Sequence, residues 1–356
     1  MAWGRVRTGL SLLTALAAGA VLLFVPPSAQ PDTGPLVAGL VWPDAQRGSF
    51  TADLPDGSTF TPALFLDART AIGTAQSRDG SGLRLVLRKT EGAVRVLRPA
   101  PPGDDASFPA VTASGDDVVW AEGHGDGRPQ LWKVNLRDGR PPRLITGDTG
   151  DARFYQSEYD LLVAGGRVHW VAAGDDQSTE LRSVALSGGP VRTSTQPGTW
   201  QQSVWPWLVD GVASTAGATV LRNPSTGRDM AVAANQRAVT NCTPSWCRVV
   251  SLDDDGMPRI EMMRPDGAAR LMVAEGVVQT AVADVAVLDR FEVYAQGGGN
   301  ADLTGNFQLF AYDITGRRAV QISPDAANVG YRAGVLWWST GNRELFLWHS
   351  LDLRTV

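Results

Sequence analysis

The turns of this chain recur at a nearly constant spacing, and this spacing limits the possible folds more than any other feature. Each repeat is a strand-like segment that ends in a polar turn closed by glycine and is followed by a second strand. Six copies align, at residues 85–92, 131–139, 181–189, 219–227, 260–267 and 309–316. Their final glycines are 47, 50, 38, 40 and 49 residues apart, about 45 on average. A period of ~40–50 residues provides one four-stranded antiparallel sheet per repeat.

The strands that precede these hairpins are apolar on both faces. Examples are residues 118–120, 168–171, 291–294 and 335–338, and each of them contains an aromatic residue. A strand of this kind must be covered on both sides. Sheets that pack face to face around a ring meet that requirement. The period and these strands together predict an all-β fold, a β-propeller, with the aromatic residues in the core between its blades.

Counting the repeats gives the number of blades. Six four-stranded blades are predicted at residues 59–103, 108–150, 157–198, 200–235, 238–276 and 279–324. The last segment has room for only three strands, at residues 328–332, 335–339 and 344–349. We expect residues 48–54 to supply the fourth strand, so that an N-terminal strand completes the C-terminal blade and leaves no open edge. Residues 48–356 then form one seven-bladed domain; six or eight blades are the alternatives.

Residues 1–27 differ from the rest of the chain. Arg5 and Arg7 precede an uncharged run, residues 9–25, which is the arrangement of an export signal. Cleavage after Ala29 would place Pro27 where a small residue is preferred, so an uncleaved N-terminal membrane anchor is the alternative to a signal peptide. Residues 28–47 follow as a predicted linker. Either interpretation places the propeller outside the cytoplasm, secreted or held at the membrane by this segment alone.

The two cysteines fit an oxidising compartment. Cys242 and Cys247 enclose only four residues, and their spacing predicts a local disulfide. A zinc site would need two further ligands, and no other Cys or His lies nearby in the sequence. We therefore expect neither a metal nor another cofactor.

Composition and motifs argue against several functions. The formal net charge of −5 gives no basic face for nucleic acid. No serine stands in a Gly-x-Ser-x-Gly elbow, and the three histidines, His124, His169 and His349, form no metal or catalytic cluster. Aspartate runs such as residues 253–255 lie at turns, where their side chains cap the backbone. No catalytic residue is predicted, although two carboxylates that met in a central channel would suit glycoside hydrolysis.

A cluster of tryptophans is the candidate ligand site. Trp200, Trp205 and Trp207 lie within eight residues, and Trp246 lies inside the predicted disulfide loop. Core packing is one interpretation. The other is an aromatic platform for a sugar or a peptide, which requires that these rings expose their faces to solvent.

The repeats at residues 131–139 and 309–316, followed by 143–146 and 320–323, resemble the third and fourth blade strands of TolB-like propellers. The chain departs from that family where it lacks the Ser-Pro-Asp-Gly turn between the first two strands of a blade. The resemblance implies a non-enzymatic interaction domain, related to exported bacterial TolB-like or WD40-like propellers. No functional residue is carried over by it.

The sequence thus predicts a non-catalytic scaffold at the cell envelope that binds a protein or another ligand. We expect a monomer whose partner is another envelope protein or a surface glycan. The alternatives are a propeller hydrolase or lyase acting on carbohydrate or peptidic envelope material, and a lectin-like propeller that binds sugar.

Overall fold

The computed structural model describes residues 34–77, 80, 82–99, 105–125, 127–211, 217–235, 237–298, 304–341 and 346–356. The chain divides into two units, Met1–Leu36 and Val37–Val356, and the fold is that of the second unit. The predicted export segment, residues 1–27, lies outside the described residues. None of the helices within the described ranges has the length and apolar character needed to cross a membrane.

The second unit consists almost entirely of antiparallel strands. Its first two sheets have four strands each, namely β2 (Phe60–Asp67), β3 (Thr70–Gln76), β4 (Leu83–Lys89), β5 (Val94–Arg98), and β6 (Ala106–Ser114), β7 (Asp117–His124), β8 (Gln130–Asn135), β9 (Arg143–Thr146). The third sheet contains β10 (Asp151–Ala152), β11 (Leu162–Ala164), β12 (Arg167–Ala173), β13 (Ser178–Ala185) and β14 (Arg192–Pro197). The next two contain β15 (Gln201–Gln202), β16 (Leu208–Val209), β17 (Val220–Asn223), β18 (Arg228–Ala231), and β19 (Ala238–Cys242), β20 (Cys247–Leu252), β21 (Pro258–Met263), β22 (Leu271–Glu275). The first, fourth and fifth sheets fall within the predicted repeats. The second begins at Ala106, before the predicted residue 108, and the third includes β10, which precedes the predicted start at residue 157.

The remaining strands form one seven-stranded sheet. They are β1 (Arg47–Thr51), β23 (Val278–Thr280), β24 (Phe291–Gln296), β25 (Phe307–Asp313), β26 (Arg318–Arg332), β27 (Val335–Gly341) and β28 (Phe346–Asp352). The long strand β26 pairs with β25 through residues 318–326 and with β27 through residues 327–332. At the far end, β1 pairs antiparallel with β28, from Arg47 opposite Leu351 to Thr51 opposite Leu347. A strand from each end of the unit therefore shares this sheet.

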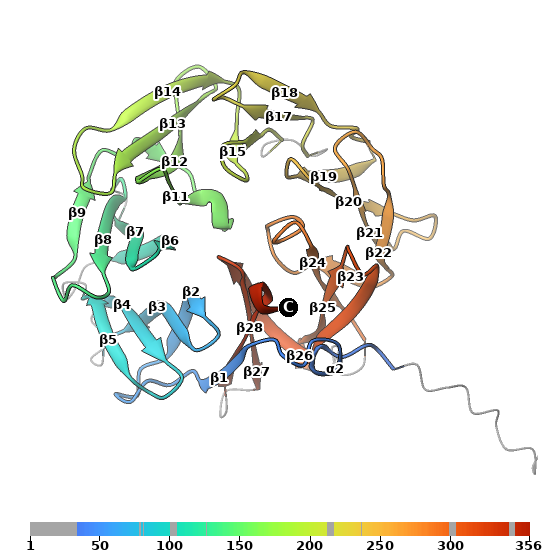
Figure 1. Ribbon diagram of the computed structural model, residues 1–356, viewed down its shortest axis with the longest axis horizontal. Coiled ribbons are helices and arrows are strands. Elements are labelled where there is room, and N and C mark those ends of the chain that lie inside the picture. The colour runs from blue at the N-terminus through green and yellow to red at the C-terminus, as the bar shows by residue number, and fades with distance from the viewer. Residues whose placement is uncertain are drawn as a thin grey trace, which may run out of the picture. The chain divides into compact units, whose positions relative to one another are not determined.

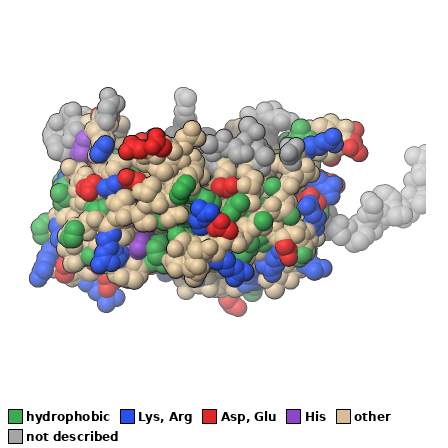
Figure 2. Space-filling view, turned by 90° about the horizontal axis from the view of Figure 1, so that it is seen from above, with side chains coloured by type: hydrophobic (Ala, Val, Ile, Leu, Met, Phe, Trp, Pro, Cys, Tyr) green, Lys and Arg blue, Asp and Glu red, His purple; other side chains and the backbone are tan. Residues whose placement is uncertain are grey.

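The sheets are arranged around a common centre (Figure 1). Strands β2, β6 and β19 lie toward the middle, whereas β5, β9 and β22 lie at the periphery. On the face seen in Figure 2, acidic, basic and apolar side chains are interspersed.

Neighbouring sheets bury their strands against one another. One core cluster joins Ile72 and Leu85 of the first sheet to Val118 and Trp120 of the second. Trp120 and its counterpart Trp170 are completely buried, as the doubly apolar strands predict. Full burial of a large apolar side chain is worth roughly 1.5–3 kcal/mol, so contacts between sheets contribute much of the stability.

The second half of the predicted linker belongs to the packed unit. Residues Ala38–Val41 form the short helix α2. Trp42 packs its ring edge-on against Phe291 of β24, with centroids 5.5 Å apart, and Ala38 and Ala45 are buried in the same cluster. The apolar side chains of this segment explain the difference from the prediction, because they cover the core beside β24.

The six glycines that mark the sequence repeat all lie in turns between strands, and all but one have a positive φ. Five of the six turn glycines adopt a positive φ, between +66° at Gly139 and +109° at Gly189. In the sixth turn, between β25 and β26, the positive φ of 49° falls on Arg317 and not on Gly316. A residue with a Cβ is strained in that conformation.

Candidate functional site

The inner ends of several sheets surround a cavity of about 600 Å³. Its walls come from β2, β6 and β26 and from the segment between β23 and β24. Asp284 is the single carboxylate among the described residues that line it, and Arg332 is the single cation there. The other lining groups are mostly apolar or belong to the main chain.

Asp284 is held by a short helical turn of the third sheet. This turn, η1 (Glu158–Asp160), forms because Ser157 and Asp160 make a capping box. The Ser157 hydroxyl accepts from the main-chain N–H of Tyr159, and the Asp160 carboxylate accepts from the main-chain N–H of Ser157. The Ser157 hydroxyl donates to Asp284 Oδ1 over 2.5 Å, and the Glu158 N–H donates to Asp284 Oδ2 over 3.1 Å. Both oxygens of Asp284 are thereby occupied by donors from a distant part of the chain.

Arg332, at the end of β26, makes the corresponding contacts on the cationic side. Its guanidinium donates to the carbonyl of Val111 in β6 over 2.9 Å and to that of Ser157 over 3.2 Å. The next residue, Ala333, donates its N–H to Glu158 Oε2 over 3.0 Å. These bonds connect the inner edges of three sheets, and each of them ends on the main chain or on a neighbouring carboxylate.

Burial shifts the protonation of these acids. Desolvation, reinforced by the charge of Asp284, raises the pKa of Glu158 to about 7. Burial also raises the pKa of Asp160, to about 6, and that of Asp284. Three acidic groups around one buried guanidinium cannot all ionise cheaply, and Glu158, with its pKa of about 7, is the one that is partly protonated near neutral pH.

A second buried ion pair supports Asp284 from behind. Arg248 of β20 donates through Nε to the carboxylate of Glu292 in β24, and its Nη2 donates to the main-chain carbonyl of Asp284 over 2.6 Å. Only 2% of the Arg248 side chain and none of Glu292 is exposed. The pair therefore joins two neighbouring sheets from within the core.

The chemistry available in the centre is limited. The described residues contain no group of three or more His, Cys, Asp or Glu side chains able to hold a metal ion. Glu158, although its pKa lies near neutrality, is not among the residues that line the cavity. The cavity thus presents one carboxylate with both oxygens already bonded, not the pair that glycoside hydrolysis requires.

A groove of about 260 Å³ lies between the third and fourth sheets. Trp205, Pro206 and Trp207, in the connection from β15 to β16, form one wall, and His169 of β12 lies below them. The rings of Trp205 and His169 stack with centroids 4.0 Å apart and planes inclined by 46°. Trp205 remains 45% exposed. Burial of His169 lowers the pKa of its imidazole. The ring is therefore neutral at pH 7 and donates from Nε2 to the carbonyl of Ala164.

The four predicted tryptophans separate into two pairs. Trp205 and Trp207 line the groove, whereas Trp200 and Trp246 are each only 7% exposed. Trp200 donates its indole N–H to the carbonyl of Pro197 and is covered by the guanidinium of Arg222. Trp200 is therefore a core residue.

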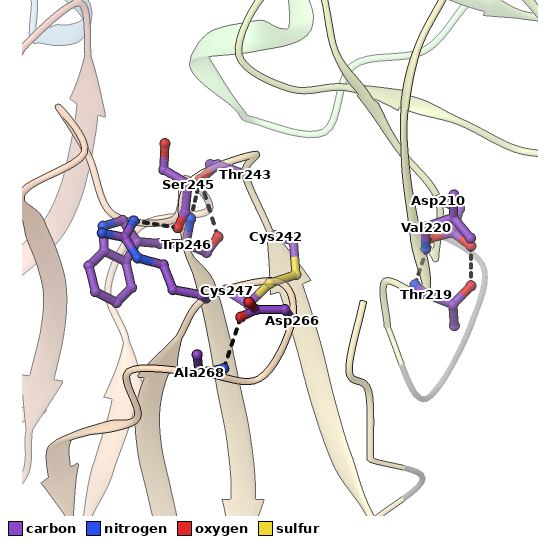
Figure 3. The surroundings of a disulfide bond; sticks show 11 residues. Asp210, Thr219, Val220, Cys242, Thr243, Ser245, Trp246, Cys247, Asp266 and Ala268 are labelled. Atoms are coloured by element: carbon purple, nitrogen blue, oxygen red, sulfur yellow. Dashed lines mark hydrogen bonds between the residues drawn. A yellow bond between two sulfur atoms is a disulfide. The ribbon is translucent and has the colours of Figure 1, made fainter. Parts of the chain in front are cut away.

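Trp246 is held by the disulfide turn (Figure 3). Cys242 and Cys247 are bonded, as predicted, and are opposite one another at the end of the β19–β20 hairpin. In Figure 3 the indole of Trp246 lies on the other side of the turn from the disulfide. The guanidinium of Arg264 lies 3.8 Å from the ring centroid and donates to the carbonyl of Ser245 over 2.8 Å. One face of Trp246 is therefore covered by a cation.

Comparison with known proteins agrees with this architecture. No protein-family model matches the chain. Over 78% of this chain and 88% of the other, the structure resembles the uncharacterized protein lmo1340 from Listeria monocytogenes EGD-e, with a TM-score of 0.51 and 9% identity. The chain has a β-propeller fold and shares its architecture with this protein. At this level of identity the likeness concerns the fold of the propeller alone.

Two further solved structures match with lower TM-scores. The β-propeller domain of the Trilobed protease from Pyrococcus furiosus matches with a TM-score of 0.46 and 11% identity, over 68% of this chain and 82% of that domain. TolB from Acinetobacter baumannii matches with a TM-score of 0.41 and 12% identity, over 72% of this chain and 64% of its own.

A stretch of 157 residues is 26% identical to the tRNA-specific 2-thiouridylase MnmA of Ralstonia nicotianae. That match spans 42% of this propeller chain and only 40% of the relative.

Sequence reasoning found the tryptophans of the groove but not the polar residues of the centre. The capping box at Ser157 and Asp160 is visible as a Ser-x-x-Asp spacing and signals a short helical turn among strands. Asp284 and Arg332 carry no local signal, because the hydrogen-bond partners of their side chains are 126 to 221 positions away in the sequence.

Proposed function

We propose that the chain is a seven-bladed propeller in which β1 completes the last blade. Division of the seven-stranded sheet at β26 supports this count. One half then contains β23, β24, β25 and the first part of β26. The other half contains the second part of β26, β27, β28 and β1. Five separate sheets and these two halves give seven units. The ring would close through main-chain bonds between β1 and β28, which would give the last blade four strands.

We infer that this propeller is a non-catalytic scaffold that binds a protein or another ligand at the cell envelope. One observation carries the proposal: the polar groups of the centre are committed to bonds between sheets. Asp284 accepts from Ser157 and Glu158, and Arg332 donates to two main-chain carbonyls. A general acid or base must be free to exchange a proton with substrate. Groups held in this way orient the blades and leave the surface grooves for recognition.

The location outside the cytoplasm is part of the proposal. The charged and apolar pattern of residues 1–27 supports export, and the bond between Cys242 and Cys247 suits an oxidising compartment. The partner would then be another envelope protein or a surface glycan. Alkylation of intact producing cells, followed by mass spectrometry of the peptide that contains both cysteines, tests this; free thiols in the native protein would contradict export.

Binding and catalysis are distinguished by following both the retained material and its mass. Immobilised full-length protein is incubated with an envelope fraction from producing cells, and the bound molecules are measured over several hours. The scaffold role predicts saturable retention with unchanged masses. The matched variant Asp284→Asn keeps the size of the side chain and should retain the same ligand. Products that accumulate with the native protein and disappear with Asp284→Asn would establish the propeller enzyme instead.

A further inference from the structure

The groove between the third and fourth sheets combines an exposed aromatic wall with two buried polar atoms that lack partners. Gln202 and Arg182 both line it, and their side chains are 6% and 8% exposed. Within the described part of the chain, neither Gln202 Oε1 nor Arg182 Nε has a hydrogen-bond partner. Buried polar atoms without partners are uncommon in folded proteins. Both atoms are closed off from solvent, so a ligand in the groove bonds to them when their side chains turn toward it.

Arg182 is positioned by its own neighbours. Its Nη1 donates to the carboxylate of Glu180 and its Nη2 to that of Asp148. The two carboxylates offset the charge of the guanidinium, and its Nε–H remains the donor without a partner. Gln202 offers the opposite polarity, and the terminal torsion of a glutamine is broad enough to turn its oxygen toward a group in the groove.

The two atoms differ in what they need. Gln202 Oε1 requires a donor and Arg182 Nε requires an acceptor, and a hydroxyl group is both. Ser183, Thr193 and Ser194 add further hydroxyls along the groove. The wall formed by Trp205 offers a flat indole face that is backed by His169. A ring with apolar C–H faces and polar hydroxyl edges matches this arrangement.

Size limits the occupant. A volume of about 260 Å³ lies just below the usual ~300–1,000 Å³ of small-molecule sites. The groove therefore suits one ring of an oligosaccharide, whose other units extend over the exposed surface. The offset charge of Arg182 removes the main reason to expect an anionic ligand.

We propose that this groove is a binding site for a neutral pyranose unit of a glycan. The sugar ring stacks on Trp205, and its hydroxyls donate to Gln202 and accept from Arg182. This inference rests on the proposed binding role and names the ligand class that the groove takes.

Isothermal titration of the full-length protein with a tetramer of β-1,4-linked N-acetylglucosamine, and separately of β-1,4-linked glucose, tests the proposal. We expect saturable binding of at least one tetramer. Trp205→Ala should weaken it by at least about tenfold, because it removes the stacking surface. Gln202→Leu should weaken it by a similar factor while the melting temperature stays the same or rises, because an unpaired buried acceptor is removed. A purely structural Gln202 would lower the melting temperature and leave the affinity unchanged.

The control variant is Leu252→Ala, which alters another exposed apolar side chain, 67% exposed, on the fifth sheet. It should leave sugar binding intact. Absence of saturable binding by either tetramer, or equal affinity in Trp205→Ala and native protein, would overturn the sugar site. A polyproline peptide that binds in place of the sugar and depends on Trp205 would also overturn it. Cleavage of a bound tetramer would refute the non-catalytic role but keep the site, whereas envelope material retained without any sugar binding would refute the site but keep the role.

Discussion

The buried pair of Arg248 and Glu292 predicts a strongly non-additive response to mutation. The two side chains come from β20 and β24, in neighbouring sheets, and are 2% and 0% exposed. Arg248→Met leaves the Glu292 carboxyl buried without its counterion, and Glu292→Leu leaves the Arg248 guanidinium in the same situation. Removal of one partner of a buried ion pair costs about 3–5 kcal/mol of unfolding free energy.

The double variant should cost much less than the sum of the two. With both charges gone, the remaining loss comes from main-chain groups that used the pair: the carbonyls of Ala283 and Asp284 and the N–H of Ala286. Unsatisfied groups of this kind cost about 2–4 kcal/mol together. The single variants together cost about 6–10 kcal/mol, so the coupling between the two side chains should be about 2–8 kcal/mol.

Urea denaturation of the full-length native protein and the three variants measures the coupling directly. The pH dependence gives a second readout. Burial raises the pKa of Glu292, and loss of Arg248 raises it further. A carboxyl whose folded pKa exceeds its unfolded value favours folding at acid pH and loses that contribution as pH rises, so Arg248→Met should be least impaired near pH 5. Single-variant costs that add to the double-variant cost within about 0.5 kcal/mol would refute the reasoning.

Three further predictions follow from individual residues. Because the pKa of Glu158 is raised to about 7, the native protein should lose stability as pH rises from about 4.5 to 7, and Glu158→Gln should reduce that slope in urea titrations. Arg317→Gly should stabilise the protein by about 1 kcal/mol, because glycine adopts the positive φ of this turn without strain. Replacement of Cys242 and Cys247 by alanine should lower the unfolding free energy by about 2 kcal/mol, the chain-entropy value for so short a loop, and reducing agent should then have no further effect.

Each of these predictions has a clear contrary result. An unchanged pH profile in Glu158→Gln would show that folding does not raise the pKa of this carboxyl. Gly316→Ala is the comparison for Arg317→Gly, since Gly316 has no positive φ, and equal stabilisation by both would contradict the role of the turn. A double alanine variant that still responds to reducing agent would show that the reductant acts elsewhere.

The fold was predictable because its signals are local and repeated. Glycine at 92, 139, 189, 227 and 267 closes a hairpin in each sheet, and the strands around Trp120 and Trp170 show by composition that both their faces are buried. A strand that is apolar on both faces must pack against a neighbouring sheet on each side. The order of the sheets therefore follows from the order of the repeats. The prediction was wrong where the signal was weak, as in the supposed linker, whose Trp42 packs on Phe291.

The functional regions were predictable only in part. Trp205 and Trp207 stood out as tryptophans beside a proline, but nothing near Trp200 or Trp246 indicated that arginines would cover them. The contact between Ser157 and Asp284 joins residues 127 positions apart. Such contacts depend on where the sheets stand around the centre, and the periodicity of a sequence does not contain that information.

The pairing of β1 with β28 has a consequence for the time course of folding. Arg47 and its partner Leu351 are separated by nearly the whole chain, so their contact closes a loop of about 300 residues. All other sheets can form from consecutive segments as these are synthesised. The last sheet must wait until the carboxyl-terminal strand has emerged from the ribosome. A chain destined for export would remain incomplete, and therefore able to thread through a narrow channel, until its final residues are made.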